Sequence, residues 1–372
     1  MRTIHKYIVL SLLLSGFSML VGAEEVVVVK ADRVETVTSG TIQNGVIVIR
    51  DGKISAVGDD VEIPGAATVI DARDKTIFPG LVNPSSRIGL SAPPGGGPAS
   101  HPQYRVADEL YPFQDAYKRV LQAGFTTLGL IPSGNGITGQ GAIARPMGET
   151  TEEMLISESG LLMINFQAND KAKKVIKDAL ESAKKQMSST DPKIKPLGRA
   201  LKGEIPTFVQ CAGPAETLHL LKLLKPYDKM KLVLLSGSEI YHVADKLAEK
   251  KISVILPAGI DFEQFTRNRI NVPKILADAG VTIACRPGTD NVEGYEDFLR
   301  EMAQLVKCGL DKEVAKKSIT LHPAEMLGLD YRLGSLDVGK DANLLILTGD
   351  PLDVGTRIHR VMIEGKMVDQ PR

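Results

Sequence analysis

The segment Pro79-Gly80-Leu81-Val82-Asn83-Pro84-Ser85-Ser86-Arg87 lies where the sequence changes from one pattern to another. Before it, the chain reads as β-structure, with an apolar run at Val26–Val29 and a turn pair, Asp51-Gly52, that is typical of a hairpin. After it, short apolar runs alternate with helical patterns. The segment therefore predicts the first strand, Leu81–Ser85, of a second structural unit.

Short apolar runs recur through this second unit. Runs that are apolar without alternation suit strands buried on both faces, as in a parallel sheet. The clearest helix follows the fourth run, where apolar residues recur at helical spacing from Ala172 to Met187. Eight strand–helix alternations in about 255 residues match a (β/α)8 TIM-like barrel in an α/β protein. The predicted strands are Leu81–Ser85, Thr126–Ile131, Ala142–Arg145, Leu161–Asn165, Phe208–Cys211, Leu232–Leu235, Ser253–Leu256 and Thr282–Cys285.

The two terminal segments of the chain are both rich in strand patterns. Ala342–Leu347 and Arg360–Ile363 read as strands, as do the runs before residue 79. Neither segment has enough strands to bury two faces alone, so we expect them to pair. The predicted organisation is a composite β-sandwich domain from residues 24–78 and 335–372, with the barrel at 79–334.

The first 23 residues have the pattern of a signal peptide. A basic start is followed by the apolar run Tyr7–Leu20 and the small residues Val21-Gly22-Ala23. The alternative is an uncleaved membrane anchor, but the run is short for spanning a bilayer. We therefore expect cleavage after Ala23 and an exported, periplasmic or secreted protein without a membrane span.

Charge and cysteine content argue against two classes of protein, those that bind nucleic acids and those held together by disulfides. The chain has 45 basic and 45 acidic residues, and a net charge of zero argues against nucleic-acid binding. Cys211, Cys285 and Cys308 are too few for a disulfide framework. Cys211 and Cys285 lie in apolar runs and are expected to be small buried hydrophobes, although one bridge is open in an oxidising compartment.

Several motifs resemble the amidohydrolase superfamily. The first predicted barrel strand is similar to that family's Pro-Gly-Leu-Ile-Asp-x-His-x-His pattern, and the resemblance continues through Ser318–Ala324, Leu327–Leu329, Gly334–Leu344 and Gly349–Pro351. The Gly134–Gly141 stretch resembles the imidazolonepropionase and prolidase-like branch. The resemblance implies hydrolysis of non-peptide C–N bonds by water bound to a divalent metal, which histidines from several strands hold.

The positions that match the family's metal ligands carry other residues. Ser85 and Arg87 replace the two histidines of the first strand, Gln210 replaces that of the fifth, and Ser236 that of the sixth. Asp290 matches the last-strand aspartate, which the resemblance makes the catalytic base. A guanidinium repels a divalent cation, so we predict that no metal or other cofactor is bound.

The same residues suggest a site at the barrel mouth. We predict Ser85, Arg87, Gln210 and Ser236 as substrate-binding residues, and Asp290 as the catalytic candidate. The alternative for the uncharged residues Ser85, Gln210 and Ser236 is that they only fill the mouth with satisfied hydrogen bonds. An internal ion pair between Arg87 and Asp290 is expected, since an unpaired charge there would be costly.

Two functions follow from this reading. The first is an exported, non-catalytic member of the family, a pseudoenzyme whose mouth binds a small molecule or which associates with itself or with an intact amidohydrolase. The second is a weak or atypical amidohydrolase acting on amides, cyclic amides or dipeptides, with Asp290 as base and Arg87 as electrostatic partner of the oxyanion. His101, in the Gly89–Gln103 loop, is the histidine expected near the mouth.

Overall fold

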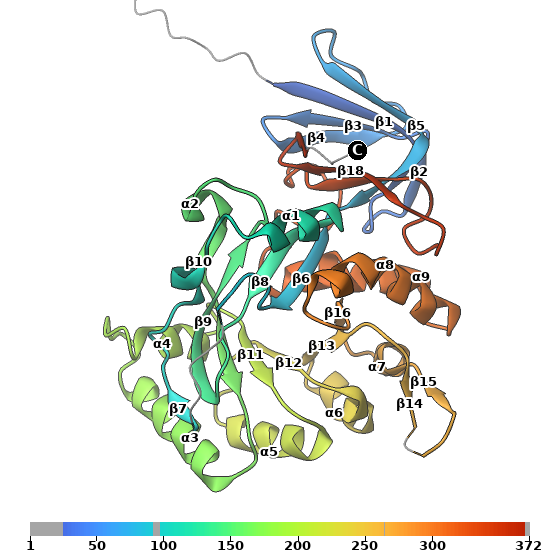
Figure 1. Ribbon diagram of the computed structural model, residues 1–372. Helices are drawn as coiled ribbons and strands as arrows, with labels where there is room; N and C mark the ends of the chain where they lie inside the picture. Colours follow the sequence, from blue (N-terminus) through green and yellow to red (C-terminus); the bar gives the residue numbers. More distant parts are fainter. Residues whose placement is uncertain (1–24, 92–96, 264, 369–372) are drawn as a thin grey trace, which may run out of the picture.

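The computed structural model describes residues 25–91, 97–263 and 265–368. Figure 1 shows two parts, a sheet built from the two terminal segments above and an α/β barrel below. The predicted signal peptide lies outside the described residues. Within the described residues, no helix combines the length and apolar character needed to cross a membrane.

The terminal segments form one mixed sheet. β5 pairs in parallel with β1 and antiparallel with β17, so the two ends of the chain share a sheet. The strand order is β19-β18-β17-β5-β1-β3-β4, with β2 paired to β1. The sandwich form and the domain bounds stay predictions. The strands are β1 (Val26–Glu35), β2 (Thr41–Gln43), β3 (Val46–Arg50), β4 (Lys53–Gly58), β5 (Thr68–Pro79), β17 (Leu344–Leu347), β18 (Ile358–Ile363) and β19 (Lys366–Val368).

The barrel sheet contains all eight predicted strands in sequence order. Its order is β16-β13-β12-β11-β10-β9-β8-β6, with the short β7 (Ala99–Ser100) paired to β9. β6 and β16 lie next to each other and nearly close the barrel, which confirms the predicted fold class. The strands are β6 (Leu81–Ser86), β8 (Phe125–Leu130), β9 (Gly136–Ala144), β10 (Leu155–Asn165), β11 (Thr207–Gln210), β12 (Leu232–Leu235), β13 (Ser253–Pro257) and β16 (Ile283–Arg286).

The regular strand–helix alternation was wrong in one quarter of the barrel. β9 runs antiparallel to both β8 and β10, and residues 131–135 join β8 to β9 without a helix. A reversed strand needs only a short turn, whereas a parallel one needs a crossover. Only the four-residue α2 (Thr151–Met154) precedes β10.

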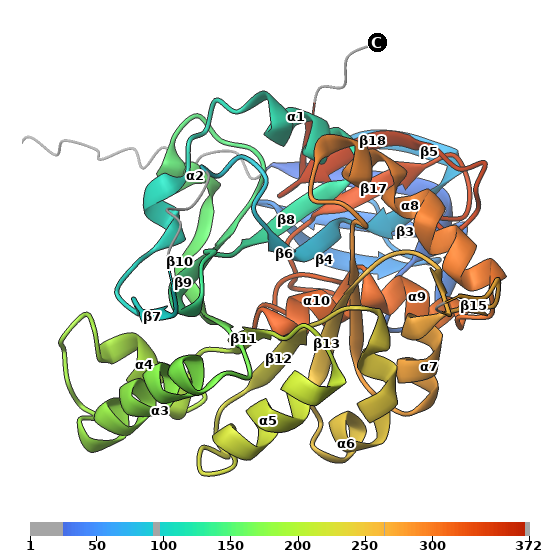
Figure 2. The same ribbon diagram turned by 60° about the horizontal axis from the view of Figure 1, so that its bottom comes forward.

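Helices cover the outside of the remaining strands, as Figure 2 shows for α5 and α6 beside β11–β13. The predicted helix after the fourth strand is α3, which the Asn169 side chain caps by accepting from the Ala172 N–H at 2.9 Å. The helices are η1 (Val106–Glu109), α1 (Asp115–Gln122), α3 (Asp170–Lys185), α4 (Lys195–Leu201), α5 (Pro214–Leu224), η2 (Ser238–Val243), α6 (Ala244–Glu249), α7 (Val272–Asp278), α8 (Val292–Lys307), α9 (Lys312–Ser318) and α10 (Leu321–Met326); the hairpin β14 (Asp261–Phe262) and β15 (Arg269–Ile270) precedes α7.

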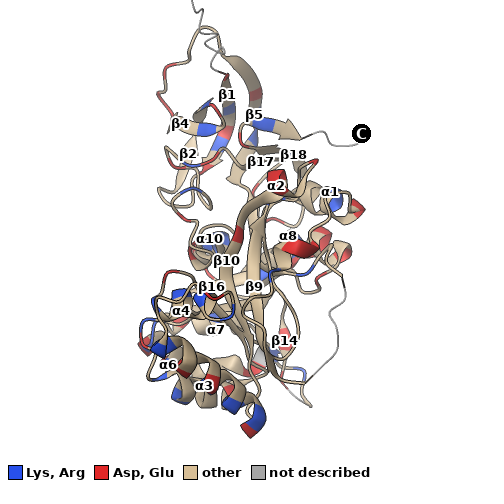
Figure 3. Cartoon of the chain, turned by 90° about the vertical axis from the view of Figure 1, so that its left-hand side faces the viewer, with Lys and Arg blue, Asp and Glu red and all other residues tan. Residues whose placement is uncertain are grey.

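Apolar side chains inside the barrel form a separate core. Val82, Met163, Phe208 and Ile255 meet there, and residues of α10 and the following turn, including Leu327, close one end. Charged residues of both signs are interspersed on the helices that face the viewer in Figure 3, and the barrel strands there are largely uncharged. The uncharged interior explains why the strands read as plain apolar runs.

The three cysteines are free. Cys211 and Cys285 are buried, as predicted, and Cys308 is partly exposed. The bridge left open by the sequence is therefore not formed.

Candidate functional site

One cavity at the carboxyl ends of the barrel strands brings together the five side chains singled out in the sequence. Its volume is about 420 Å³, and its lining includes Ser85, Arg87, Gln210, Ser236 and Asp290. Barrel enzymes carry their active sites at this end of the strands. The cavity is therefore the candidate functional site.

Asp290 lies in a short loop whose shape is fixed locally. The loop joins β16 to α8, and the Asn291 side chain caps α8 by accepting from the Gly294 N–H at 3.0 Å. The Thr289 hydroxyl donates to the Asn291 side chain at 2.7 Å, and the Gly288 N–H donates to Glu301 at 3.2 Å. These hydrogen bonds hold the loop, and with it Asp290, in place without the help of a ligand.

Three groups surround the Asp290 carboxylate. The Ser86 hydroxyl donates to Oδ1 at 2.8 Å, and the Arg87 backbone N–H donates to Oδ2 at 2.5 Å. The Tyr295 hydroxyl lies 3.2 Å from Oδ1. These bonds join the end of β6 to the loop after β16, where the strand ladder of the barrel does not close. Asp290 thus has a structural role at this seam.

Tyr295 is the buried centre of the same network. Its side chain is only 1% exposed, and its hydroxyl accepts from the Asn83 amide at 2.7 Å and lies 2.7 Å from Ser86 Oγ. Burial and the nearby Asp290 charge raise the pKa of Tyr295 well above its usual value. The phenol therefore stays protonated, so that its hydroxyl can accept a hydrogen bond from Asn83 and donate one to Ser86.

The expected ion pair between Arg87 and Asp290 was wrong. The Arg87 guanidinium donates instead to the backbone carbonyls of Ile131, at 3.0 Å, and Ser91, at 2.5 Å. Only the Arg87 backbone reaches Asp290. The carboxylate accepts instead from the Ser86 hydroxyl and the Arg87 N–H, and the guanidinium holds the loop after β6 to the end of β8.

The remaining predicted residues are uncharged. Ser85 is buried, with its N–H donating to the Asn83 side chain at 3.0 Å. The Ser236 hydroxyl donates to the Cys211 carbonyl at 3.2 Å, and the Gln210 side chain is exposed at the rim. Burial, with a smaller effect of a nearby glutamate, raises the pKa of the Cys211 thiol to about 12, so it is not a nucleophile at neutral pH.

The donor set does not fit a divalent metal. Hydroxyls, an amide and a guanidinium stand at the positions that match the family's histidines, and Asp290 supplies one carboxylate. Within residues 25–91, 97–263 and 265–368, no three His, Cys, Asp or Glu side chains gather as a metal site would require.

Within the part of the chain that the structure describes, no histidine lines this cavity. His101 is exposed just after β7, and its backbone N–H donates to the Ile137 carbonyl at 2.8 Å near the start of β9. His219 and His242 are exposed on the outside. His322 has Nδ1 2.9 Å from the Ile283 carbonyl, and burial lowers the pKa of its imidazole.

Sequence reasoning missed three residues of this site. Ser86 lies between the two positions compared with histidines, and Tyr295 belongs to α8, which was not among the helices identified from the sequence. Arg286 ends β16 and also lines the cavity. The signal for Arg286 was present, because an arginine follows the apolar run of the eighth strand.

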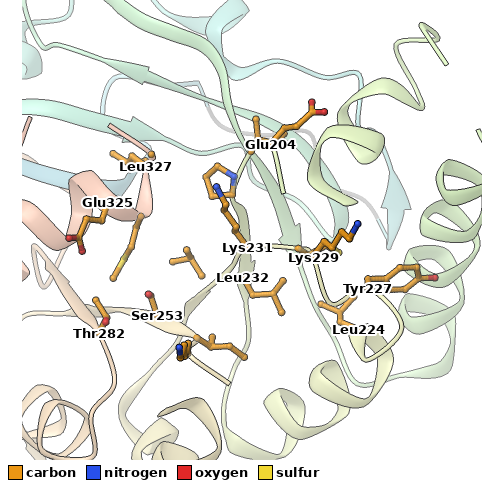
Figure 4. Close-up of a pocket in the computed structure, with 18 of the residues that line it drawn as sticks. Glu204, Leu224, Tyr227, Lys229, Lys231, Leu232, Ser253, Thr282, Glu325 and Leu327 are labelled. Atoms are coloured by element: carbon orange, nitrogen blue, oxygen red, sulfur yellow. The ribbon is translucent and has the colours of Figure 1, made fainter. Parts of the chain in front are cut away.

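A larger cavity of about 930 Å³ lies at the opposite end of the barrel. Figure 4 shows its lining, in which Lys229 and Lys231 accompany apolar residues such as Leu232 and Leu327. The amino ends of β11, β12 and β13 line this cavity. In barrel enzymes the residues at that end of the strands contribute to stability, and the active site lies at the opposite end. Size alone does not make it the functional site.

Comparisons with known proteins agree with the geometry. The family model described as "Amidohydrolase family" matches residues 170–368, just over half of the chain. An imidazolonepropionase from Geobacillus sp. (strain WCH70) is 23% identical over 367 residues, covering 82% of this chain and 84% of that protein. An adenine deaminase from Clostridium botulinum (strain 657 / Type Ba4) is 24% identical over 92% of this chain, which spans 57% of that protein's length.

Solved structures show the same architecture. The crystal structure of an amidohydrolase from Thermotoga maritima MSB8 is 25% identical, with a TM-score of 0.81, and the match covers 93% of this chain and all of that one. A prolidase structure complexed with N-methylphosphonate-L-proline is 15% identical, with a TM-score of 0.59, and covers 93% of this chain and 100% of that chain. At that identity the prolidase supports the fold alone.

Proposed function

The chain belongs to the amidohydrolase family, and we propose that it is a member that binds a small molecule at the barrel mouth without metal-dependent hydrolysis. Family membership gives it hydrolase ancestry, and the family normally uses a divalent metal. The observation that carries the proposal is the composition of the mouth. Ser85, Arg87, Gln210 and Ser236 line a cavity of small-molecule size, and none of them is a good ligand for such an ion.

The contacts of Asp290 also support this proposal. A base that activates water needs a free oxygen facing the reacting atoms. Here Ser86 and Tyr295 lie against one carboxylate oxygen, and the Arg87 N–H donates to the other. The carboxylate is used to join β6 to the loop after β16.

The second candidate is an atypical amidohydrolase. Asp290 does line the cavity, and the family and its relatives favour a hydrolase. In this function Arg87 would stabilise the oxyanion that forms when water attacks the amide carbonyl. Its guanidinium, however, already donates to the carbonyls of Ile131 and Ser91. The geometry therefore favours binding over turnover.

Metal content and hydrolysis distinguish the two candidates. Protein purified without chelators is analysed for bound metal, and dipeptides, lactams and hydantoins are then screened with added Zn²⁺ or Mn²⁺. We expect less than stoichiometric metal and no turnover. Stoichiometric metal, or hydrolysis that is lost in Asp290→Asn, would favour the amidohydrolase over the non-catalytic binding protein.

A variant that restores the family's ligands gives a positive control for the metal measurement. Ser85→His, Arg87→His, Gln210→His and Ser236→His together place four imidazoles around the cavity beside Asp290. We expect this variant, checked for folding by circular dichroism, to retain more Zn²⁺ than the wild type. Equal retention by both proteins would contradict the proposed loss of the metal site.

Export and association are further parts of the proposal. The pattern of residues 1–23 supports a cleaved signal peptide, and sequencing the N-terminus of the protein from its native host tests it. An N-terminus beginning at Glu24 is expected. Light scattering of the purified protein, alone and mixed with an intact amidohydrolase from the same host, tests the proposed homo- or hetero-oligomer.

A further inference from the structure

Arg286 is a cation at the mouth whose hydrogen-bonding capacity is largely unused. It is the last residue of β16, it is partly buried, and it lines the cavity. One guanidinium nitrogen donates to the neighbouring Pro287 carbonyl at 3.1 Å. Across the described part of the chain, no carboxylate forms a salt bridge with it.

The other charged groups of the cavity differ from Arg286 in this respect. The guanidinium of Arg87 bridges the carbonyls of Ile131 and Ser91. Asp290 accepts hydrogen bonds at both of its carboxylate oxygens. The mouth thus contains one carboxylate that already accepts a hydrogen bond at each oxygen and one guanidinium that still has donors to offer.

A partly buried guanidinium with free donors favours an anion. Its planar arrangement of N–H groups matches a carboxylate in a two-bond contact, which is stronger than a neutral hydrogen bond. Partial burial removes water from the charge and makes an opposite charge more favourable there. An anionic ligand group would supply that charge.

The remaining lining suggests what accompanies the anion. Gln210 at the end of β11 and Ser236 just after β12 offer neutral polar groups, and Leu235 and Ile255 offer apolar surface. β12 and β13 stand between β11 and β16, so the neutral groups and Arg286 lie on different parts of the wall. A volume of about 420 Å³ accommodates a small organic molecule.

We infer that the mouth binds a small organic carboxylate, with the carboxylate on Arg286 and a neutral polar group facing Gln210 and Ser236. This inference rests on the proposed metal-independent binding function and adds the chemical class of the ligand. It assigns to Arg286 the selection of an anion over its neutral analogue.

The test compares an acid with its amide by isothermal titration calorimetry. N-acetyl-leucine and N-acetyl-leucinamide differ in the charge of one group and are otherwise closely matched. We expect the wild type to bind the acid at least tenfold more tightly than the amide. Arg286→Gln should lose that preference without weakening amide binding, and Arg286→Lys should retain part of it.

A matched control separates this effect from a general loss of positive charge. Arg300→Gln removes an arginine on α8 that pairs with Asp297 at the surface, and it should bind the acid as the wild type does. Circular dichroism and thermal unfolding verify that each variant is folded. Acid binding that is unchanged in Arg286→Gln, or lost equally in Arg300→Gln, overturns the inference.

Further outcomes separate the inference from the proposed function. If the amide binds as tightly as the acid, the anion inference fails and metal-independent binding survives. If neither probe binds, the inference also fails. Inorganic phosphate that binds tenfold more tightly than the acid overturns the carboxylate class. Stoichiometric metal with turnover overturns the proposed function itself.

Discussion

Lys316 of α9 and Glu35 of β1 form a buried ion pair although 281 positions separate them in the chain. Lys316 Nζ lies 2.6 Å from Glu35 Oε2, and the two side chains are 4% and 2% exposed. Arg33 also donates to Glu35, and Glu313 lies 2.8 Å from Lys316 Nζ. The pair joins the terminal sheet to the helices at the end of the barrel.

Removing Lys316 should destabilise the protein strongly. Lys316→Met removes the more deeply buried of the two cations that contact Glu35 and leaves Arg33 as its partner. Breaking a buried pair from one side costs about 3–5 kcal/mol, and the remaining contact with Arg33 places the expected loss toward the lower end. Lys317→Met, on the same helix, is the control, and we expect it to cost less than about 1 kcal/mol. Urea unfolding measures both. An equal decrease in the free energy of unfolding in both variants would show that the buried ion pair does not stabilise the fold more than a surface lysine does.

Stability should fall in acid through Glu35. Burial raises the pKa of this carboxyl, but hydrogen bonds from Lys316 and Arg33 outweigh it and leave the pKa below the usual 4.5. The unfolded chain therefore binds the proton first, so the contribution is complete above about pH 4.5 and is lost as the pH falls through the lowered value.

The variant Glu35→Gln tests this pH dependence. It has no carboxyl at this position, so its free energy of unfolding should fall less steeply between about pH 5 and pH 3. The slope should be reduced but not abolished, because the pKa of Asp350 is also lowered; burial opposes this, and hydrogen bonds from groups including Lys312 and Arg33 outweigh it. A slope identical to that of the wild type would exclude Glu35 as a contributor.

Asp290→Ala should lower stability at the barrel seam. The change removes the acceptor of the Ser86 hydroxyl and the Arg87 N–H, and hydrogen bonds to a charged group are worth about 1.5–3 kcal/mol where they are shielded. Since Asp290 is exposed to solvent, we expect about 1–2 kcal/mol. Asp297→Ala, on the surface of α8, is the control. Thermal unfolding that does not distinguish the two would contradict the structural role.

Gly80 cannot carry a side chain between the two sheets. A Cβ at this position would lie 2.2 Å from the hydroxyl oxygen of Thr126, a residue that is only 1% exposed. Gly80→Ala should therefore cost about 1–3 kcal/mol as an overpacked site. Gly213→Ala, which meets nothing within 4 Å, is the control. Adding Thr126→Ala to Gly80→Ala should restore part of the stability measured by urea unfolding.

The sequence predicted the strands well because burial on both faces leaves a local trace. The runs around Phe208, Leu234 and Ile255 are largely apolar, with polar residues only at their ends, and each is a barrel strand. The direction of β9 left no such trace. β9 lies between β8 and β10, pairing with residues such as Leu128 and Leu162, and its residues would be buried whether it ran parallel or antiparallel.

The site was predictable in its location but less so in its contacts. Matching single positions on successive strands correctly brought Gln210, Ser236 and Asp290 to one cavity. Side-chain direction was beyond this reasoning. Whether the Arg87 guanidinium turns to Asp290 or to two carbonyls depends on the path of the loop after β6, and Tyr295 meets Ser86 across 209 positions of sequence.

The pairing of β5 with β17 constrains the order in which the protein can form during synthesis. Leu344–Leu347 leaves the ribosome well after Thr68–Pro79, so one side of β5 has no partner while the whole barrel is being made. An open strand edge is a template for joining another chain. Chains that stop before residue 344 should therefore aggregate through this edge.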